Sequence, residues 1–120
     1  MALITIDTNI VIHALAGNTN AVKSIEGNEC LISFMAVIEL LSWKEIASQS
    51  SLIKKFLSNC IVKDNDVQLQ QIVIDTRLNY GLKIPDAFIA ATAMRYNLLL
   101  VSGDPVFKRI KELDFLLVEF

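Results

Sequence analysis

Histidine and cysteine are nearly absent from this chain, which limits the metals that it can bind. Among its 120 residues there is one histidine, His13, and there are two cysteines, Cys30 and Cys60. The cysteines form no CxxC pair and lie in apolar surroundings, so we expect free, buried thiols in a reducing cytosol. Protein zinc sites rely mainly on histidine and cysteine. The sequence therefore gives poor support for a zinc site, and it favours a cytoplasmic location.

The chain also lacks long apolar runs, linkers, repeats and low-complexity segments. No stretch approaches the roughly 20 uncharged apolar residues that a membrane helix needs. The start, MALITIDTNIVIHALAG, has no basic region and carries Asp7, so we expect no signal peptide. We therefore expect a single domain over residues 1–120 that does not enter a membrane. Its 53% hydrophobic content is above the usual level, and this favours an apolar surface covered by a partner.

A large excess of charge of either sign is missing as well. The net charge of −2 comes from 13 acidic and 11 basic side chains, which on its face argues against nucleic acid. If four acids belong to a metal site, nine acids remain against 11 bases. Bulk charge therefore does not decide what the protein binds.

Short apolar segments alternate with helical patterns along the whole chain. This alternation predicts an α/β fold with three layers, in which a central, mostly parallel sheet of about five strands is flanked by helices. Ligands of such sheets bind outside the carboxyl ends of the strands. We expect strands at 2–6, 30–33, 60–63, 98–102 and 115–120, and helices at 8–17, 19–26, 34–47, 51–58, 67–80, 85–96 and 105–113.

Four carboxylates occupy positions that this fold would bring toward one edge of the sheet. Asp7 directly follows the first expected strand, and Asp104 comes shortly after the fourth. Glu39 interrupts an apolar stretch of the helix after the second strand, where a carboxylate is costly unless it has a partner. Asp86 begins the alanine-rich helix of the segment IPDAFIAATA.

Four carboxylates that lie together repel one another, and they stay ionised only if a cation neutralises them. Oxygen ligands without histidine or cysteine suit Mg²⁺ or Mn²⁺, which can activate water and stabilise charge on a phosphate. Three of these acids also fit simple structural roles. Asp7 can cap a helix, Asp86 can interact with a helix dipole, and Asp104 can form a turn before proline. The metal-site hypothesis thus depends on the order and the expected geometry of all the acids.

The motifs around these acids resemble those of the PIN-domain ribonucleases, and most of all those of VapC-type toxins of type II toxin–antitoxin systems. IDTNIVI resembles the opening strand of the family with its Asp-Thr/Ser-Asn/Ser signature. AVIEL resembles the segment that carries the second acid. IPDAFIAATA is similar to the third motif and is the most specific, while LVSGDPVF resembles the fourth. The resemblance covers essentially the whole chain and implies a PIN-like fold.

The resemblance also implies a role for each matching residue. Asp7, Glu39, Asp86 and Asp104 would be the catalytic, metal-binding acids, with Asp7 and Asp86 as the principal ligands. The polar residues Asn9 and Ser102 would support them. Two positions depart from the family pattern, since Ser102 stands where threonine is commoner and Val106 replaces a frequent second acid.

By resemblance, the activity would be a Mg²⁺- or Mn²⁺-dependent endoribonuclease reaction. Metal-bound water would attack an RNA phosphodiester and leave a 5′-phosphate and a 3′-hydroxyl, with either one or two metal ions. RNA needs positive charge beside the acids. Lys108, Arg109 and Lys111 are the best placed candidates, although they also fit a solvated helix face. Further candidates are Lys44, Lys54, Lys55 and Lys83.

The partners implied by the resemblance are a second copy of the chain and a small antitoxin protein. Antitoxins of this class lie across an apolar groove near the active site, and they often place a basic side chain among the acids. We expect Phe34, Trp43 and Ile46 to contact the antitoxin. Phe34 and Trp43 would also suit two different roles, in which they stack on an RNA base or pack in the core.

Some other enzyme classes also have an aspartate after their first strand, where this chain has Asp7. A HAD-type phosphatase needs a second aspartate where this chain has Asn9, and a phosphoacceptor receiver domain needs an acidic pair and a later lysine that are absent here. The main alternative is a catalytically inactive PIN-like module that binds RNA or a protein.

Overall fold

A parallel sheet forms the centre of the computed structural model, which describes all 120 residues apart from the side chain of Ile46. Within this described chain the sheet has five strands in the order β3-β2-β1-β4-β5, and each neighbouring pair is parallel. The predicted sheet is therefore confirmed. The strands are β1 (Leu3–Ile6), β2 (Glu29–Ser33), β3 (Ile61–Lys63), β4 (Leu100–Ser102) and β5 (Phe115–Leu117).

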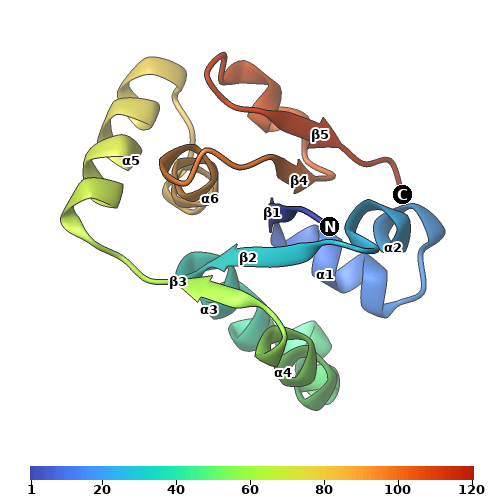
Figure 1. Cartoon of the computed structure of the whole chain (residues 1–120). Helices are drawn as coiled ribbons and strands as arrows, with labels where there is room; N and C mark the ends of the chain where they lie inside the picture. The colour runs from blue at the N-terminus through green and yellow to red at the C-terminus, as the bar shows by residue number, and fades with distance from the viewer.

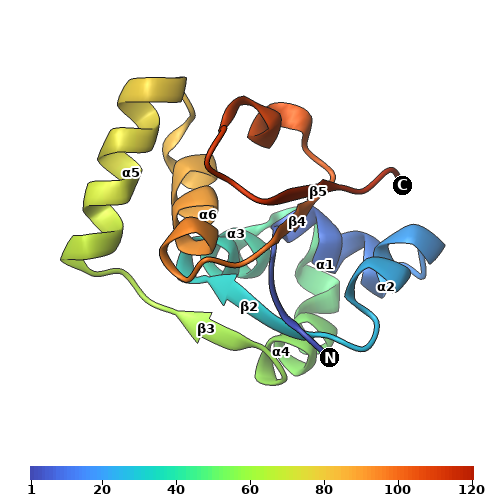
Figure 2. The same ribbon diagram turned by 45° about the horizontal axis from the view of Figure 1, so that its top comes forward.

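Helices cover both faces of the sheet, as the three-layer prediction requires. Figures 1 and 2 show α1 to α4 on one side and α5 and α6 on the other. Right-handed crossovers explain this division, because the chain first steps from β1 outward to β3 and then returns past β1 to reach β4. The helices are α1 (Thr8–Leu15), α2 (Thr19–Ile25), α3 (Phe34–Ser42), α4 (Ser50–Ser58), α5 (Val67–Tyr80) and α6 (Ile84–Arg95), with 3₁₀ turns η1 (Lys44–Gln49) and η2 (Pro105–Arg109).

Local sequence signals set several helix ends where they were predicted. Ser33 caps α3, since its Oγ accepts a hydrogen bond of 3.1 Å from the amide of Met35. Asp66 caps α5 in the same way, through a bond of 2.8 Å from the amide of Leu69. Gly81 ends α5 in the left-handed conformation, with φ of 68°.

Two predicted helices end earlier than expected. The helix predicted over 34–47 stops at Ser42, because Trp43 has an extended backbone and the chain continues as η1. The residues that follow Ser42, from Trp43 to Glu45, have exposed side chains, so no burial against the core favours a longer helix. The helix predicted over 105–113 is only the turn η2. Ile110 turns to an extended backbone and is buried, which directs the chain into β5.

The alanine-rich helix α6 packs against the sheet and against α5. Its residues Ala87, Ala90, Ala91 and Ala93 have no exposed surface. Small side chains allow the close approach that the sequence predicted, and α6 contacts β1 and β2 directly. This packing holds the first turn of α6, where Asp86 lies, in a fixed direction relative to the strands.

Candidate active site

Asp7 stands at the carboxyl end of β1 and is 4% exposed. One oxygen, Oδ1, accepts from the amide of Thr8 at 2.7 Å and from the Thr8 hydroxyl at 3.3 Å. The other, Oδ2, accepts from Ser102 Oγ at 2.7 Å and from Asn9 Nδ2 at 3.2 Å. Burial raises the pKa of Asp7, the hydrogen bonds from Ser102 and Thr8 lower it, and the charge of Asp104 adds to the rise. A dense set of donors thus surrounds a buried carboxylate.

Asn9 and Ser102 tie the end of β1 to the end of β4. Asn9 donates to Ser102 Oγ at 3.3 Å, and its Oδ1 accepts from the amide of Gly103 at 2.9 Å. Ser102 has no exposed surface, and its Oγ also accepts from the amide of Asp104 at 3.0 Å. The sequence predicted polar support from both residues, and the structure places both of them against Asp7.

Asp104 begins the short turn η2 directly after β4. Its Oδ1 accepts from the amide of Val106 at 2.9 Å, so the carboxylate is a turn cap, as one interpretation of the sequence proposed. The other oxygen is not used by that bond. Because Asp104 also raises the pKa of Asp7 and of Asp86 through its charge, it belongs to the same electrostatic cluster.

Glu39 and Asp86 approach this cluster from two different helices. Burial raises the pKa of Glu39, and the charges of Asp7 and Asp86 raise it further. Burial also raises the pKa of Asp86, followed by the charges of Asp104 and Asp7, while Lys83 opposes the change. Charge effects on the pKa thus connect Asp7, Asp86 and Asp104 with one another, and connect Glu39 with Asp7 and Asp86.

The donor set of this cluster fits a hard, hydrated ion. Among the side chains that the structure describes, no group of three acids, histidines or cysteines is close enough to form a ready-made cage. Mg²⁺ commonly keeps several waters and uses one or two carboxylates, so it does not need such a cage. The ring of His13 stacks on the ring of Phe120 at a centroid distance of 3.8 Å. Carboxylates under mutual repulsion are suitable ligands for Mg²⁺ or Mn²⁺.

A hollow of about 410 Å³ opens beside Glu39. Trp43 lines it and is 40% exposed, whereas Phe34 is half-buried and packs edge-on against Phe88. Of the predicted antitoxin contacts, Trp43 is thus accessible and Phe34 is largely part of the packing between α3 and α6. The predicted contact of Ile46 concerns a side chain that lies outside what the structure describes. The hollow is lined by Thr8, Ile12, Glu39, Leu40, Ser42 and Trp43.

The basic residues predicted to contact RNA are exposed. Lys108 and Arg109 belong to η2, which starts immediately after Asp104, and Lys111 follows in the next turn. Lys83 precedes α6 and is close enough to lower the pKa of Asp86. Lys44, Lys54 and Lys55 are exposed on η1 and α4.

Two residues of the site had no role in the sequence prediction. Thr8 donates twice to Asp7 and lines the hollow beside Glu39. Gly103 contributes its amide to Asn9. Thr8 could have been found as a neighbour of the aspartate in the Asp-Thr-Asn triplet, whereas the contact of Gly103 joins segments that are 94 positions apart and has no local signal.

Comparison with protein families gives a match over nearly the whole chain. A family model described as PIN domain matches residues 4–113. A sequence comparison with curated proteins finds no match. No helix of the described chain has the length and apolar character to cross a membrane.

Solved structures of toxin–antitoxin complexes have the same fold. VapBC2 from Rickettsia felis, bound to a DNA fragment from its promoter, gives a TM-score of 0.81 with 25% identity and covers 99% of this chain and 100% of its own. A toxin–antitoxin complex from Klebsiella pneumoniae gives 0.82 with 26% identity, over 92% of this chain and 94% of its own. DNA-bound VapBC from Salmonella typhimurium gives a TM-score of 0.79 with 19% identity and covers 97% of this chain and 98% of its own. This last similarity concerns the fold alone. The resemblance drawn from the sequence motifs is confirmed.

Proposed function

The chain belongs to the PIN domain family, and from this premise we propose that it is a metal-dependent endoribonuclease and the toxin of a toxin–antitoxin pair. The observation that carries the proposal is the buried Asp7 at the end of β1, which shares an electrostatic cluster with Glu39, Asp86 and Asp104. The toxin–antitoxin complexes among the structural neighbours support the toxin role.

In the proposed mechanism Asp7 and Asp86 hold Mg²⁺ or Mn²⁺, and Glu39 and Asp104 complete the site directly or through water. The bound ion would supply water activation and stabilise charge on the phosphate. Ser102 and Asn9 fix the orientation of Asp7 through their hydrogen bonds. Either Glu39 or Asp104 would orient the attacking water, since both complete the site beside the two principal ligands.

Positive charge beside the cluster would hold the RNA backbone. Lys108 and Arg109 lie on the turn after Asp104, and Lys83 already interacts with Asp86 through its charge. Their exposure allows phosphate contacts that neutralise repulsion between the substrate and the acids.

We propose two protein partners and a cytoplasmic location. The hollow beside Glu39, with the exposed Trp43 at its wall, would receive an antitoxin segment that blocks the site. A second copy of the chain would cover the apolar groove of about 520 Å³ between α5 and α6, where Ile74, Leu78 and Ile84 are exposed. The free cysteines agree with a reducing compartment.

The nuclease proposal is tested with Asp86→Asn and with EDTA. Purified wild-type protein and the variant are incubated with a mixed RNA pool and Mn²⁺, and the fragments and their ends are analysed. We expect wild type to cut and to leave 5′-phosphates. We expect Asp86→Asn and EDTA to reduce the rate by roughly a hundredfold or more, because a charge that the ion requires is lost.

Asp75→Asn is the matched control, since Asp75 is an exposed acid in α5. If Asp86→Asn cuts as fast as this control, Asp86 is only a helix-start acid and the metal site is wrong. If folded, antitoxin-free wild type binds RNA without cutting any RNA in the pool, the inactive binding module becomes the better description.

The antitoxin proposal is tested with Trp43→Ala. Truncation of a half-exposed tryptophan at the centre of an interface typically costs about 2 kcal/mol or more, so we expect the affinity for the cognate antitoxin to fall by roughly 30-fold. Isothermal titration calorimetry measures this change. Leu116→Ala removes a similarly exposed side chain from β5 and serves as the control. Equal affinities of the two variants would remove Trp43 from the interface.

A further inference from the structure

The side chain of Phe120 lies against the site loop between β4 and η2. Its ring stacks face to face on the ring of His13, with a centroid distance of 3.8 Å and an angle of 9° between the planes. The same ring covers the Cα of Gly103. A Cβ at Gly103 would lie 2.2 Å from Phe120 Cε2 and 2.7 Å from Cζ, distances that real atoms do not adopt.

This contact explains why residue 103 is a glycine. Three glycines, Gly17, Gly27 and Gly81, have positive φ angles, and Gly103 is not one of them. The φ angle of Gly103 therefore does not require glycine, and the three atoms nearest to an added Cβ all belong to the ring of Phe120. Because Gly103 has no Cβ, the ring of Phe120 packs against its backbone, directly before Asp104.

The segment that carries Phe120 is held in place by contacts with two other parts of the fold. The amide of Val118 donates to the Ser102 carbonyl at 2.9 Å, which extends the pairing of β4 and β5. Asn18 Nδ2 donates to the Phe120 carbonyl at 2.9 Å, and Asn20 Nδ2 donates to the Glu119 carbonyl at 2.8 Å. The start of α2 lies beside this end of the chain (Figure 1).

Helix α1 contacts both Gly103 and the ring of Phe120. Asn9 and His13 are four positions apart in α1, so they share one face of the helix. Asn9 accepts from the amide of Gly103, while His13 stacks on the ring that covers the Gly103 Cα. The Gly103 peptide is thus held by Asn9 and by Phe120, and both are anchored to the helix that Asp7 caps.

We propose that Phe120 and His13 form an aromatic clamp, the stacked ring pair over Gly103, that positions Asp104 relative to Asp7. Phe120 is a positioning residue, because its contact is with the Gly103 backbone and its effect passes through that loop. The proposal rests on the proposed nuclease function for its catalytic consequence. Its structural content can be tested without RNA or metal.

The first test is amide hydrogen exchange in the metal-free protein. The amides of Gly103 and Asp104 are both hydrogen-bonded, so their exchange reports the opening of the loop. We expect Phe120→Ala to speed their exchange by about tenfold or more, while amides of α5 stay unchanged. Phe120→Tyr, which keeps the ring, should restore wild-type exchange, and Leu116→Ala is the control for an exposed apolar side chain of the neighbouring strand. Wild-type exchange in Phe120→Ala overturns the proposal.

The second test is a double-mutant cycle between Gly103 and Phe120. Gly103→Ala should disturb the loop strongly when the ring is present and only weakly in a Phe120→Ala background, where the methyl group has room. Equal effects of Gly103→Ala in both backgrounds overturn the clamp. If Phe120→Ala fails to fold, Phe120→Leu replaces it in both tests, since leucine keeps an apolar side chain and removes the flat ring.

The third test separates the clamp from the nuclease function. In RNA cleavage with Mn²⁺, Phe120→Ala should lower kcat by roughly tenfold to a hundredfold with little change in KM, because only the site geometry is affected. Unchanged exchange and unchanged kcat, together with loss of cleavage in Asp86→Asn, would reject the clamp and keep the nuclease. Faster exchange in a protein whose wild type cuts no RNA would keep the clamp and reject the nuclease.

Discussion

At the scale of single residues, a structural role and a site role coexist in Asp7. Its Oδ1 caps α1 through the amide of Thr8, while its Oδ2 receives Ser102 and Asn9. The helix-cap interpretation and the metal-site hypothesis therefore do not exclude each other. A cap also fixes the direction of a carboxylate, which a metal ligand requires.

The pKa of Asp86 reflects its burial at the start of α6 and the charges around it. An acid in the first turn of a helix gains typically 0.3–1 kcal/mol from the dipole, which would lower its pKa. Burial and the charges of Asp104 and Asp7 instead raise the pKa above the ordinary value of 3.8. The net direction is upward although the charge of Lys83 lowers the pKa.

The raised pKa values predict a pH-dependent stability difference between wild type and Asp86→Asn. When the pKa of a group is higher in the folded state than in the unfolded state, its contribution to stability is fully present at pH values below the unfolded-state pKa. This contribution is lost as the pH rises through the folded-state pKa. We therefore expect the metal-free variant to become increasingly more stable than wild type as pH rises above about 4. At neutral pH it should melt roughly 2–5 °C higher.

Thermal denaturation in EDTA at each pH measures this difference, which includes the effect of the Asp86 charge on the pKa of Glu39. Addition of Mn²⁺ should raise the melting temperature of wild type and have little effect on the variant. A stability difference that does not depend on pH would contradict the electrostatic cluster.

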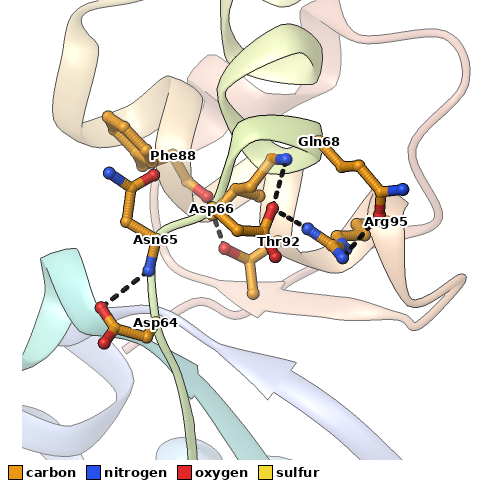
Figure 3. A network of polar contacts seen from close by, with 8 residues as sticks. Asp64, Asn65, Asp66, Gln68, Phe88, Thr92 and Arg95 are labelled. Atoms are coloured by element: carbon orange, nitrogen blue, oxygen red, sulfur yellow. Dashed lines mark hydrogen bonds and ion pairs between the residues drawn. The ribbon is translucent and has the colours of Figure 1, made fainter.

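At the scale of elements, one capping network connects the start of α5 to the end of α6. Figure 3 shows Asp66 between the backbone of α5 and Arg95, which also donates to Gln68 at 2.8 Å. The hydrogen bond from the Leu69 amide lowers the pKa of Asp66 first, and Arg95 lowers it further. This network lies where the start of α5 meets the end of α6, the helix that carries Asp86.

Asp66→Ala and Asp66→Asn distinguish the helix cap from the ion pair. Asparagine keeps the acceptor for the Leu69 amide, and a surface ion pair contributes little. We expect Asp66→Ala to lower the melting temperature by roughly 3–6 °C and Asp66→Asn by only about 1–2 °C. Differential scanning calorimetry gives both values. Arg95→Ala, which leaves the cap intact, should resemble Asp66→Asn, and an equal loss in Asp66→Asn and Asp66→Ala would mean that the ion pair dominates.

At the scale of the whole molecule, apolar side chains remain exposed along the outer side of α5 and at the start of α6. Val67 is 79% exposed, Ile74 50%, Leu78 81% and Ile84 47%. Such a contiguous surface beside an apolar groove is typical of an interface. It agrees with the proposal of a homodimer that closes over the groove between α5 and α6.

Leu78→Asp tests this dimer. A buried, unpaired charge in a symmetric interface acts in both copies, so we expect wild type to elute as a dimer and the variant as a monomer. Size-exclusion chromatography with light scattering at micromolar concentration measures the masses. Leu52→Asp places the same charge on an exposed apolar position of α4 and should remain dimeric. A monomeric wild type, or dissociation of both variants, would reject this face.

Much of the fold could be predicted because its signals are local. Caps such as Ser33 and Asp66 and the left-handed Gly81 act within a few residues of the helix ends that they set. The break after Ser42 had no such signal, since it follows from where the core ends. The order of strands and helices followed from hydrophobic patterns, and the fold class was correct for that reason.

Local signals were enough to predict the α/β alternation, the parallel sheet, and the places of Asp7, Asp86 and Asp104 near element ends, because periodicity, apolar runs and caps are properties of short segments. Glu39 was predicted within a helix, and it lies inside α3. How these acids are held depends on contacts between distant parts of the chain. The bonds from Ser102 to Asp7 and from Gly103 to Asn9 join residues more than 90 positions apart. The ring of Phe120 over Gly103 likewise depends on how β4, β5 and α1 pack together. Contacts of this kind arise from the closing of the whole chain into layers, and no short stretch of sequence contains them.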